Sequence, residues 1–155
     1  MGLGPVKEGR FLLPGADRRP ADVLIPHWTG GQDTALDITV TSSLQTATVD
    51  RESTEPGYAL TLAHERKLLG AEEDCRRQGL AFVPLTVEAL GGWHPSAEAQ
   101  VKKLGSSLAL HSGQEEEETI SFLWRRLSIL LQKGNFAILG NRIPEFPPPD
   151  IGGVL

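Results

Sequence analysis

Two short apolar stretches near the N-terminus decide the fold. Residues 21–25 read Ala-Asp-Val-Leu-Ile, and residues 35–41 read Ala-Leu-Asp-Ile-Thr-Val-Thr. The first is a β-branched run closed by Pro26, and the second alternates apolar and polar residues, as strands do. The Thr-Gly-Gly-Gln-Asp stretch at residues 29–33 has turn chemistry. The two strands are therefore predicted to pair antiparallel as a hairpin, with a loop longer than the tightest turns.

A helix and a third strand are predicted after this hairpin. The helix covers residues 58–78 and stops before Gly79, since glycine is a common residue just after a helix. Residues 80–87 (LAFVPLTV) form the third strand. Pro84 has no N–H for the ladder, so this strand is expected at a sheet edge or with a bulge.

Two more helices are predicted in the C-terminal half. Ser96 is expected to cap the first, which starts at about Ala97. The second covers residues 119–131, and a short helical piece is expected over residues 136–139. The helix over residues 119–131 carries an apolar stripe with regular helical spacing, and this stripe is expected to be buried. It consists of Ile120, Leu123, Trp124, Leu127, Leu130 and Leu131.

The predicted order β-β-α-β-α-α specifies an α/β fold, with a small mixed three-stranded sheet and flanking helices. The chain has 155 residues, the length of one domain. Residues 1–19 are expected to be an irregular lead-in and residues 20–143 the folded domain. Residues 144–155 are rich in Pro and Gly and are expected to be an extended tail.

Composition narrows the classes of function. The single cysteine excludes a disulfide framework, and no apolar run reaches the roughly 18 residues of a membrane helix. An intracellular chain with no membrane partner is expected. The net charge of −5 counts against a large nucleic-acid footprint. A local basic patch formed by Arg10, Arg18 and Arg19 remains available, and the sequence specifies no oligomeric state.

Two carboxylates, Asp22 and Asp37, lie inside the first two predicted strands. Burying an ionised carboxylate costs several kcal/mol unless it is paired or bound to a metal. Each acid could lie at an edge or hold a local hydrogen bond. Alternatively, one shared divalent cation would satisfy both, and oxygen ligands suit Mg²⁺.

Lys67 lies on the same face of the predicted helix as Leu60, Ala63, His64 and Ala71. Among these small apolar residues, its amine either turns outward to solvent or reaches into a polar site. His27, His94 and His111 stand alone in the sequence and are interpreted as surface or turn residues. Cys75 is interpreted as a small packing residue.

Three stretches together resemble a known pattern. Residues 19–22 (Arg-Pro-Ala-Asp) are followed, after fourteen intervening residues, by residues 37–40 (Asp-Ile-Thr-Val), and then by residues 63–67 (Ala-His-Glu-Arg-Lys). This order is similar to the restriction-like endonuclease domain near the C-terminus of some non-LTR retrotransposon and reverse-transcriptase-like polyproteins. Residues 82–93 (FVPLTVEALGGW) are similar to its third strand and Gly-Trp turn. The likeness covers roughly residues 10–143.

The resemblance implies a PD-(D/E)XK nuclease fold, in which a helix precedes the first strand; this chain would start at the end of that helix. It implies that Asp22 and Asp37 bind Mg²⁺ or Mn²⁺, and that these two and Lys67 are catalytic. In the wider fold a lysine stands two positions after the second acid. Thr39 is there in this chain, and Lys67 matches the relatives that supply the lysine from the next helix.

The sequence leaves three interpretations of the chain's function open. In the first, the chain is a metal-dependent DNA endonuclease-like domain derived from a mobile element, a fragment of a larger polyprotein that would be nuclear. Arg10, Arg18 and Arg19 would then contact DNA. In the second, it is a relic of that fold that no longer cleaves and acts, if at all, as a binding module; the acidic charge favours this reading. In the third, it is an unrelated α/β scaffold whose strand acids are edge residues.

Overall fold

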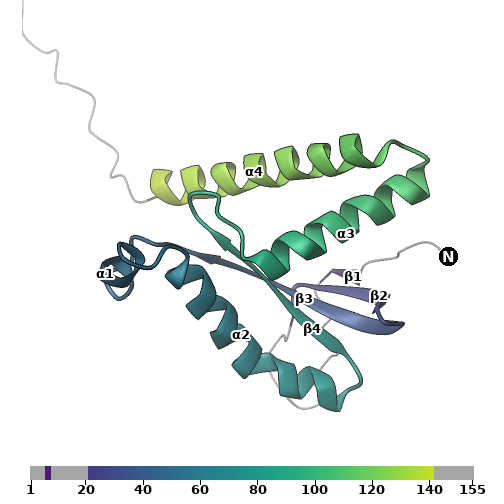
Figure 1. Ribbon diagram of the computed structural model, residues 1–155, viewed down its shortest axis with the longest axis horizontal. Helices are drawn as coiled ribbons and strands as arrows, with labels where there is room; N and C mark the ends of the chain where they lie inside the picture. The colour runs from purple at the N-terminus through teal and green to yellow at the C-terminus, as the bar shows by residue number, and fades with distance from the viewer. Residues whose placement is uncertain (1–5, 8–20, 142–155) are drawn as a thin grey trace, which may run out of the picture.

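The computed structural model describes residues 6–7 and 21–141 and shows a small sheet between helices (Figure 1). The elements in chain order are β1 (Val6–Lys7), β2 (Val23–Thr29), β3 (Gln32–Thr41), α1 (Val49–Glu52), α2 (Tyr58–Arg77), β4 (Ala81–Glu88), α3 (Pro95–Ser112) and α4 (Glu116–Gly140). The expected lead-in thus contains a two-residue strand, while the expected tail at residues 144–155 lies outside the described residues. The short α1 was not predicted.

The strands form one mixed sheet in the order β1-β2-β3-β4. β2 and β3 are antiparallel, and β3 and β4 are parallel, joined by a crossover through α2. The prediction of a mixed α/β fold is therefore confirmed for its three long strands, to which β1 adds a short fourth. In the described sheet β4 is an edge strand, one of the two alternatives predicted from Pro84, and it pairs with β3 from Thr34 to Thr41 without a register shift.

The hairpin between β2 and β3 is tighter than predicted. Thr29 pairs with Gln32, so only Gly30 and Gly31 form the turn, both at positive φ (58° and 83°). Two consecutive positive φ values are typical of a type I′ turn, which suits the twist of a hairpin.

The prediction that the first strand closes at Pro26 is wrong. β2 continues to Thr29 through a register shift between Ile25 and Thr29, where His27 has a φ of 54°. The irregularity accommodates a proline that cannot donate to the ladder.

The structure also corrects the predicted start of α3 and the predicted end of α4. α3 begins at Pro95 and is capped by His94, whose side chain accepts from the Ser96 N–H; the assignment of Ser96 as the cap is wrong. Proline suits the first helical position because its missing N–H would be unpaired there. α4 extends without interruption to Gly140, so residues 136–139 are its last turn rather than a separate piece.

Helices cover the two faces of the sheet unequally (Figure 1). Because side chains alternate along a strand, Asp37 and Thr39 of β3 lie on the face that α2 covers. Leu36, Ile38 and Val40 lie on the opposite face, toward α3 and α4. Each face has its own buried cluster: Ala21, Ala35, Cys75 and Phe82 under α2, and Ile25, Trp28, Leu36, Leu85 and Ala97 under α3.

α4 is held at three points. Gly105 of α3 lies so close to α4 that an added Cβ would be 2.6 Å from Ile120 Cγ1. The rings of Trp93 and Trp124 meet edge-on with centroids 5.4 Å apart. Near the other end of α4, Asn135 Nδ2 donates to the Ala89 carbonyl at 2.6 Å. None of the described helices is long and apolar enough to cross a membrane.

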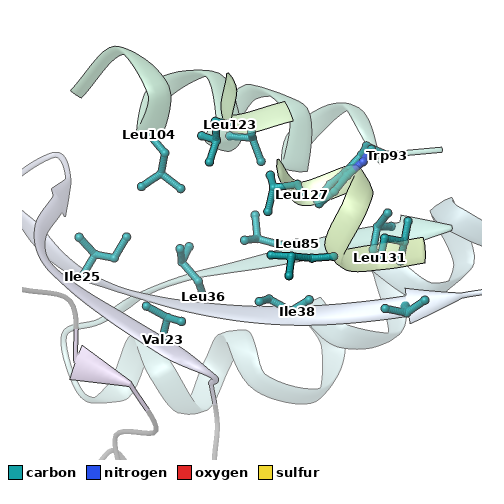
Figure 2. Close-up of a pocket in the computed structure, with 14 residues that line it drawn as sticks. Val23, Ile25, Leu36, Ile38, Leu85, Trp93, Leu104, Leu123, Leu127 and Leu131 are labelled. Atoms are coloured by element: carbon teal, nitrogen blue, oxygen red, sulfur yellow. The ribbon is translucent and has the colours of Figure 1, made fainter. Parts of the chain in front are cut away.

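Between these contacts an apolar cleft of about 500 Å³ remains between the sheet and the two C-terminal helices (Figure 2). The expected burial of the α4 stripe is therefore only partly correct. Leu123 and Leu127 point into the cleft and are half-buried, whereas Leu130 is 55% exposed. The stripe faces the sheet, but α4 packs mainly on α3 and does not close against the strands.

Candidate active site

The centre of the candidate site is an ion pair between β3 and α2. Lys67 Nζ lies 2.8 Å from Asp37 Oδ2. The Asp37 side chain is only 14% exposed, while that of Lys67 is 42% exposed. The acid is thus held against the sheet, while the Lys67 side chain remains partly exposed to solvent.

β3 fixes the position of Asp37. This strand is internal, with β2 on one side and β4 on the other. Asp37 Oδ2 also accepts from Thr39 Oγ1 at 3.1 Å, across the two-residue repeat of the strand. An edge position therefore does not explain Asp37. Its burial is compensated by a lysine and a hydroxyl, as a buried carboxylate requires.

α2 fixes the position of Lys67. Ala71 and Cys75, on later turns of the helix, pack on the cluster that includes Phe82 of β4, so this face is pressed against the sheet. Of the two alternatives for Lys67, the amine takes the polar one and reaches Asp37. Burial, Asp74 and then Asp37 raise the pKa of the Cys75 thiol. Cys75 is therefore a protonated packing residue beside the ion pair.

Asp22 lies beside the same part of β3. Its N–H donates to the Leu36 carbonyl at 2.9 Å, and its Oδ2 accepts from the Ile38 N–H at 2.7 Å. The backbone and side chain of Asp22 thus bind the residues on both sides of Asp37. Asp22 itself is exposed and precedes β2, so a local hydrogen bond accounts for its placement.

The two acids fit a divalent cation in their donor chemistry. In the described part of the chain, the hydrogen bonds and ion pair of Asp37 all use Oδ2, and the side-chain hydrogen bond of Asp22 also uses Oδ2. One carboxylate oxygen of each acid is left for another ligand. Mg²⁺ is bound by one or two carboxylates together with water and substrate phosphate. Among the described residues no cluster of three or more His, Cys, Asp or Glu could hold a metal.

Polar residues of β4 extend this face, and the sequence reasoning missed them. Thr86 pairs with Thr39 and Glu88 with Thr41. Thr86 Oγ1 is fully buried and has no hydrogen-bond partner among the described residues, while Glu88 accepts a hydrogen bond from Ser43. Thr39 and Thr41 follow Asp37 at every second position of β3, so they lie on the same face of the sheet. Thr86 and Glu88 are likewise two positions apart in β4 and lie on that face. The pattern was therefore visible in the sequence.

A pair of histidines lies on the same side as α2. His64, one turn before Lys67, stacks on His94, with ring centroids 3.8 Å apart and planes 13° apart. Ser96 Oγ lies 2.8 Å from His94 Nδ1 and 3.5 Å from His64 Nδ1. The interpretation of His94 as an isolated turn residue is therefore wrong, because packing joins it to α2.

The three arginines proposed for DNA contact, Arg10, Arg18 and Arg19, lie outside the described residues. The structure thus brings Lys67 to Asp37, and it places Asp22 on the backbone of Leu36 and Ile38, the neighbours of Asp37.

No protein-family model, curated protein or solved structure matches this chain.

Proposed function

We propose that the chain is a nuclease-like domain that hydrolyses DNA phosphodiesters with Mg²⁺ or Mn²⁺, with Asp22, Asp37 and Lys67 as its catalytic residues. The proposal joins the resemblance in the sequence to one structural observation, the 2.8 Å contact between Lys67 Nζ and Asp37 Oδ2. A restriction-endonuclease-like core and an origin in a mobile element belong to the same proposal.

The roles proposed for the three residues follow from their chemistry. Asp37, with support from Asp22, would hold the cation, which when bound would supply Lewis-acid polarisation of the phosphate. Lys67 presents its amino group beside Asp37. An ammonium has three donors, and the contact with Asp37 Oδ2 uses one. The other two can bind a phosphate oxygen or position the attacking water as negative charge develops.

Nicking of supercoiled plasmid tests this function. The wild-type chain is incubated with Mg²⁺, with Mn²⁺ or with EDTA, and nicked product is expected only with a metal. Lys102→Ala is a matched control, because Lys102 is an exposed lysine of α3 on the other side of the sheet. It should nick at the wild-type rate. A wild-type chain that never nicks would remove the enzymatic proposal.

The second candidate function is a binding module that has lost cleavage. The observation that favours it is the apolar cleft between the sheet and α4, together with the net charge of −5. Exposed apolar patches are often interaction sites, and acidic proteins are poor general ligands for DNA. In this case Asp37 and Lys67 form a structural ion pair only.

DNA binding in rising salt separates the two candidates. Phosphate contacts release counterions, so the affinity of a nuclease for plasmid DNA falls as salt rises. For a protein-binding module, no salt-dependent DNA binding is expected, and Lys67→Ala should not change retention on DNA. A loss of affinity on Lys67→Ala but not on Lys102→Ala would favour the nuclease.

A further inference from the structure

The side of α4 that faces away from the sheet carries a row of large apolar side chains, the outer row. It consists of Phe122, Ile129 and Phe136, which are 55%, 56% and 79% exposed. Residues seven apart in an α-helix differ by only about 20° around its axis, so the three lie nearly in line. Leu127 and Leu131, two residues to either side of Ile129, line the cleft on the opposite side of the helix. α4 forms an outer edge of the molecule (Figure 1), so the outer row is separate from the cleft and from the core.

Cations border the outer row on both sides. Arg125 and Lys133 are four residues before and after Ile129, which places them on opposite flanks, about 40° from it around the axis. Arg126 lies on the same flank as Lys133. All three cations are exposed, and no ion pair joins any of them to another described residue. This face is thus locally positive in a chain whose net charge is −5.

This pattern is typical of one half of a contact between two helices. In such contacts an apolar row with a seven-residue repeat forms the seam, and the charged residues beside it select the partner. Exposed ion pairs add little free energy, so the apolar row would supply most of the affinity and the cations the choice of partner. Arg125, Arg126 and Lys133 complement a helix whose own apolar seam is bordered by Asp and Glu.

Two other occupants match this face less well. An antiparallel pair of two copies centred on Ile129 would place Arg125 of one copy beside Lys133 of the other, and a parallel pair would place like cations side by side. Such juxtaposition of like charges is unfavourable. A helix that lies on a membrane buries a wide apolar face, whereas the outer row spans only about 40°. Glu118, one turn before Phe122 on the same face, is exposed and would be repelled by anionic lipid.

We propose that the outer row and its bordering cations dock an amphipathic helix of another protein, with an apolar seam bordered by Asp and Glu. The face is distinct from the apolar cleft, and the proposal does not rest on nuclease activity. It requires no movement of α4, because the side chains that would make the contact are already exposed.

Two helical peptides of about three heptads each serve as probes. They share a leucine seam, and one has Glu and the other Lys at the positions that border it. The wild-type chain should bind the Glu peptide at least about tenfold more tightly in fluorescence anisotropy, with the preference falling as salt rises. Ile129→Ser should weaken this binding at least about tenfold, as the loss of a central apolar anchor does. The matched control is Leu69→Ser, which alters an 88% exposed leucine of α2 and should bind like the wild type.

A reversal of charge tests the choice of partner. Arg125→Glu combined with Lys133→Glu should abolish the preference for the Glu peptide or reverse it, whereas Lys102→Glu on α3 should preserve it. These side chains are exposed, so the variants should fold, and unfolding curves verify this.

Three results would overturn the proposal. The first is equal binding of the two peptides, or binding of the Glu peptide that Ile129→Ser does not change. The second is self-association in sedimentation velocity, in place of peptide binding, that Ile129→Ser abolishes, because the occupant would then be a second copy. The third is binding to vesicles of phosphatidylserine and phosphatidylcholine, in place of peptide binding, that is lost on Phe136→Ser. None of these measurements depends on whether the chain cleaves DNA.

Discussion

The two faces of the sheet carry side chains from the same strands but differ in polarity and closure. On the face under α2, Asp37 and Thr39 of β3 meet Lys67, and the apolar residues around them are closely packed. On the opposite face, the intervening apolar residues of β3 line a cleft that α4 leaves open. The alternation of side chains along β3 thus separates two kinds of surface. One face holds an ion pair in a fixed geometry, and the other exposes apolar side chains to a cleft.

Phe82→Ala should give the largest change in stability and tests how closely the α2 face is packed. Phe82 is 9% exposed and lies in the cluster with Ala35 and Cys75. Truncation of a buried phenylalanine costs about 3–5 kcal/mol. Urea unfolding measures this cost. A loss below about 1 kcal/mol would show that this face, too, is loosely packed.

Gly105→Ala tests the contact that fixes α4 on α3. The added Cβ would be 2.6 Å from Ile120 Cγ1 and 3.2 Å from Ile120 Cα, so the helices must move apart. Overpacking of this kind costs about 1–3 kcal/mol. Gly134→Ala is the matched control, because nothing lies within 4 Å of its Cβ position in α4. This control should stabilise the chain by about 0.5–1 kcal/mol. Equal effects of the two substitutions in thermal unfolding would contradict the close contact.

Leu127→Ala measures how open the cleft is. Leu127 lines the cleft and is half-buried. We expect a cost of about 1 kcal/mol, below the 2–5 kcal/mol of a fully buried leucine. The comparison with Phe82→Ala should therefore show the difference between the faces directly. A cost above about 3 kcal/mol in urea unfolding would mean that α4 closes on the sheet in solution.

Acid should destabilise the chain through the histidine pair, and this is the smallest effect we expect. The pKa values of His64 and His94 are lowered in the fold, chiefly by burial. Their contribution to stability is therefore complete above the unfolded value of about 6.5 and is lost as pH falls through the folded values. Unfolding curves between pH 7.5 and about 5 measure this loss. His64→Phe should flatten the dependence, and an unchanged slope would show that the pair does not titrate as described.

Local patterns in the sequence predicted much of the sheet and of the candidate site. The alternation around Asp37, the proline in β4 and the glycine after α2 each act on neighbouring residues, so their consequences were foreseeable. The helical spacing of Lys67 left two directions open, and only the packing of α2 on β3 selects Asp37. The stack of His64 on His94 depends on two distant segments, and no local pattern encodes it.

The open cleft was not foreseeable for a similar reason. The apolar stripe of α4 indicates burial, but it does not specify how near the sheet the helix comes. The contacts at Gly105, Trp124 and Asn135 set that distance. Elsewhere, the Ser96 assignment failed because a histidine before a proline can cap a helix with its ring nitrogen.

We propose that Asp37 and Lys67 act together in metal-dependent phosphodiester hydrolysis, and two variants measured side by side test this. Plasmid nicking and Mn²⁺ binding are determined for Lys67→Ala and Asp37→Asn, with unfolding curves to verify that each folds. Lys67→Ala should lower the nicking rate about 100-fold or more and keep metal binding, as expected for a group that stabilises developing charge. Asp37→Asn should lose both. Full activity of Lys67→Ala, or metal binding that Asp37→Asn does not change, would show that the two residues do not act together in catalysis.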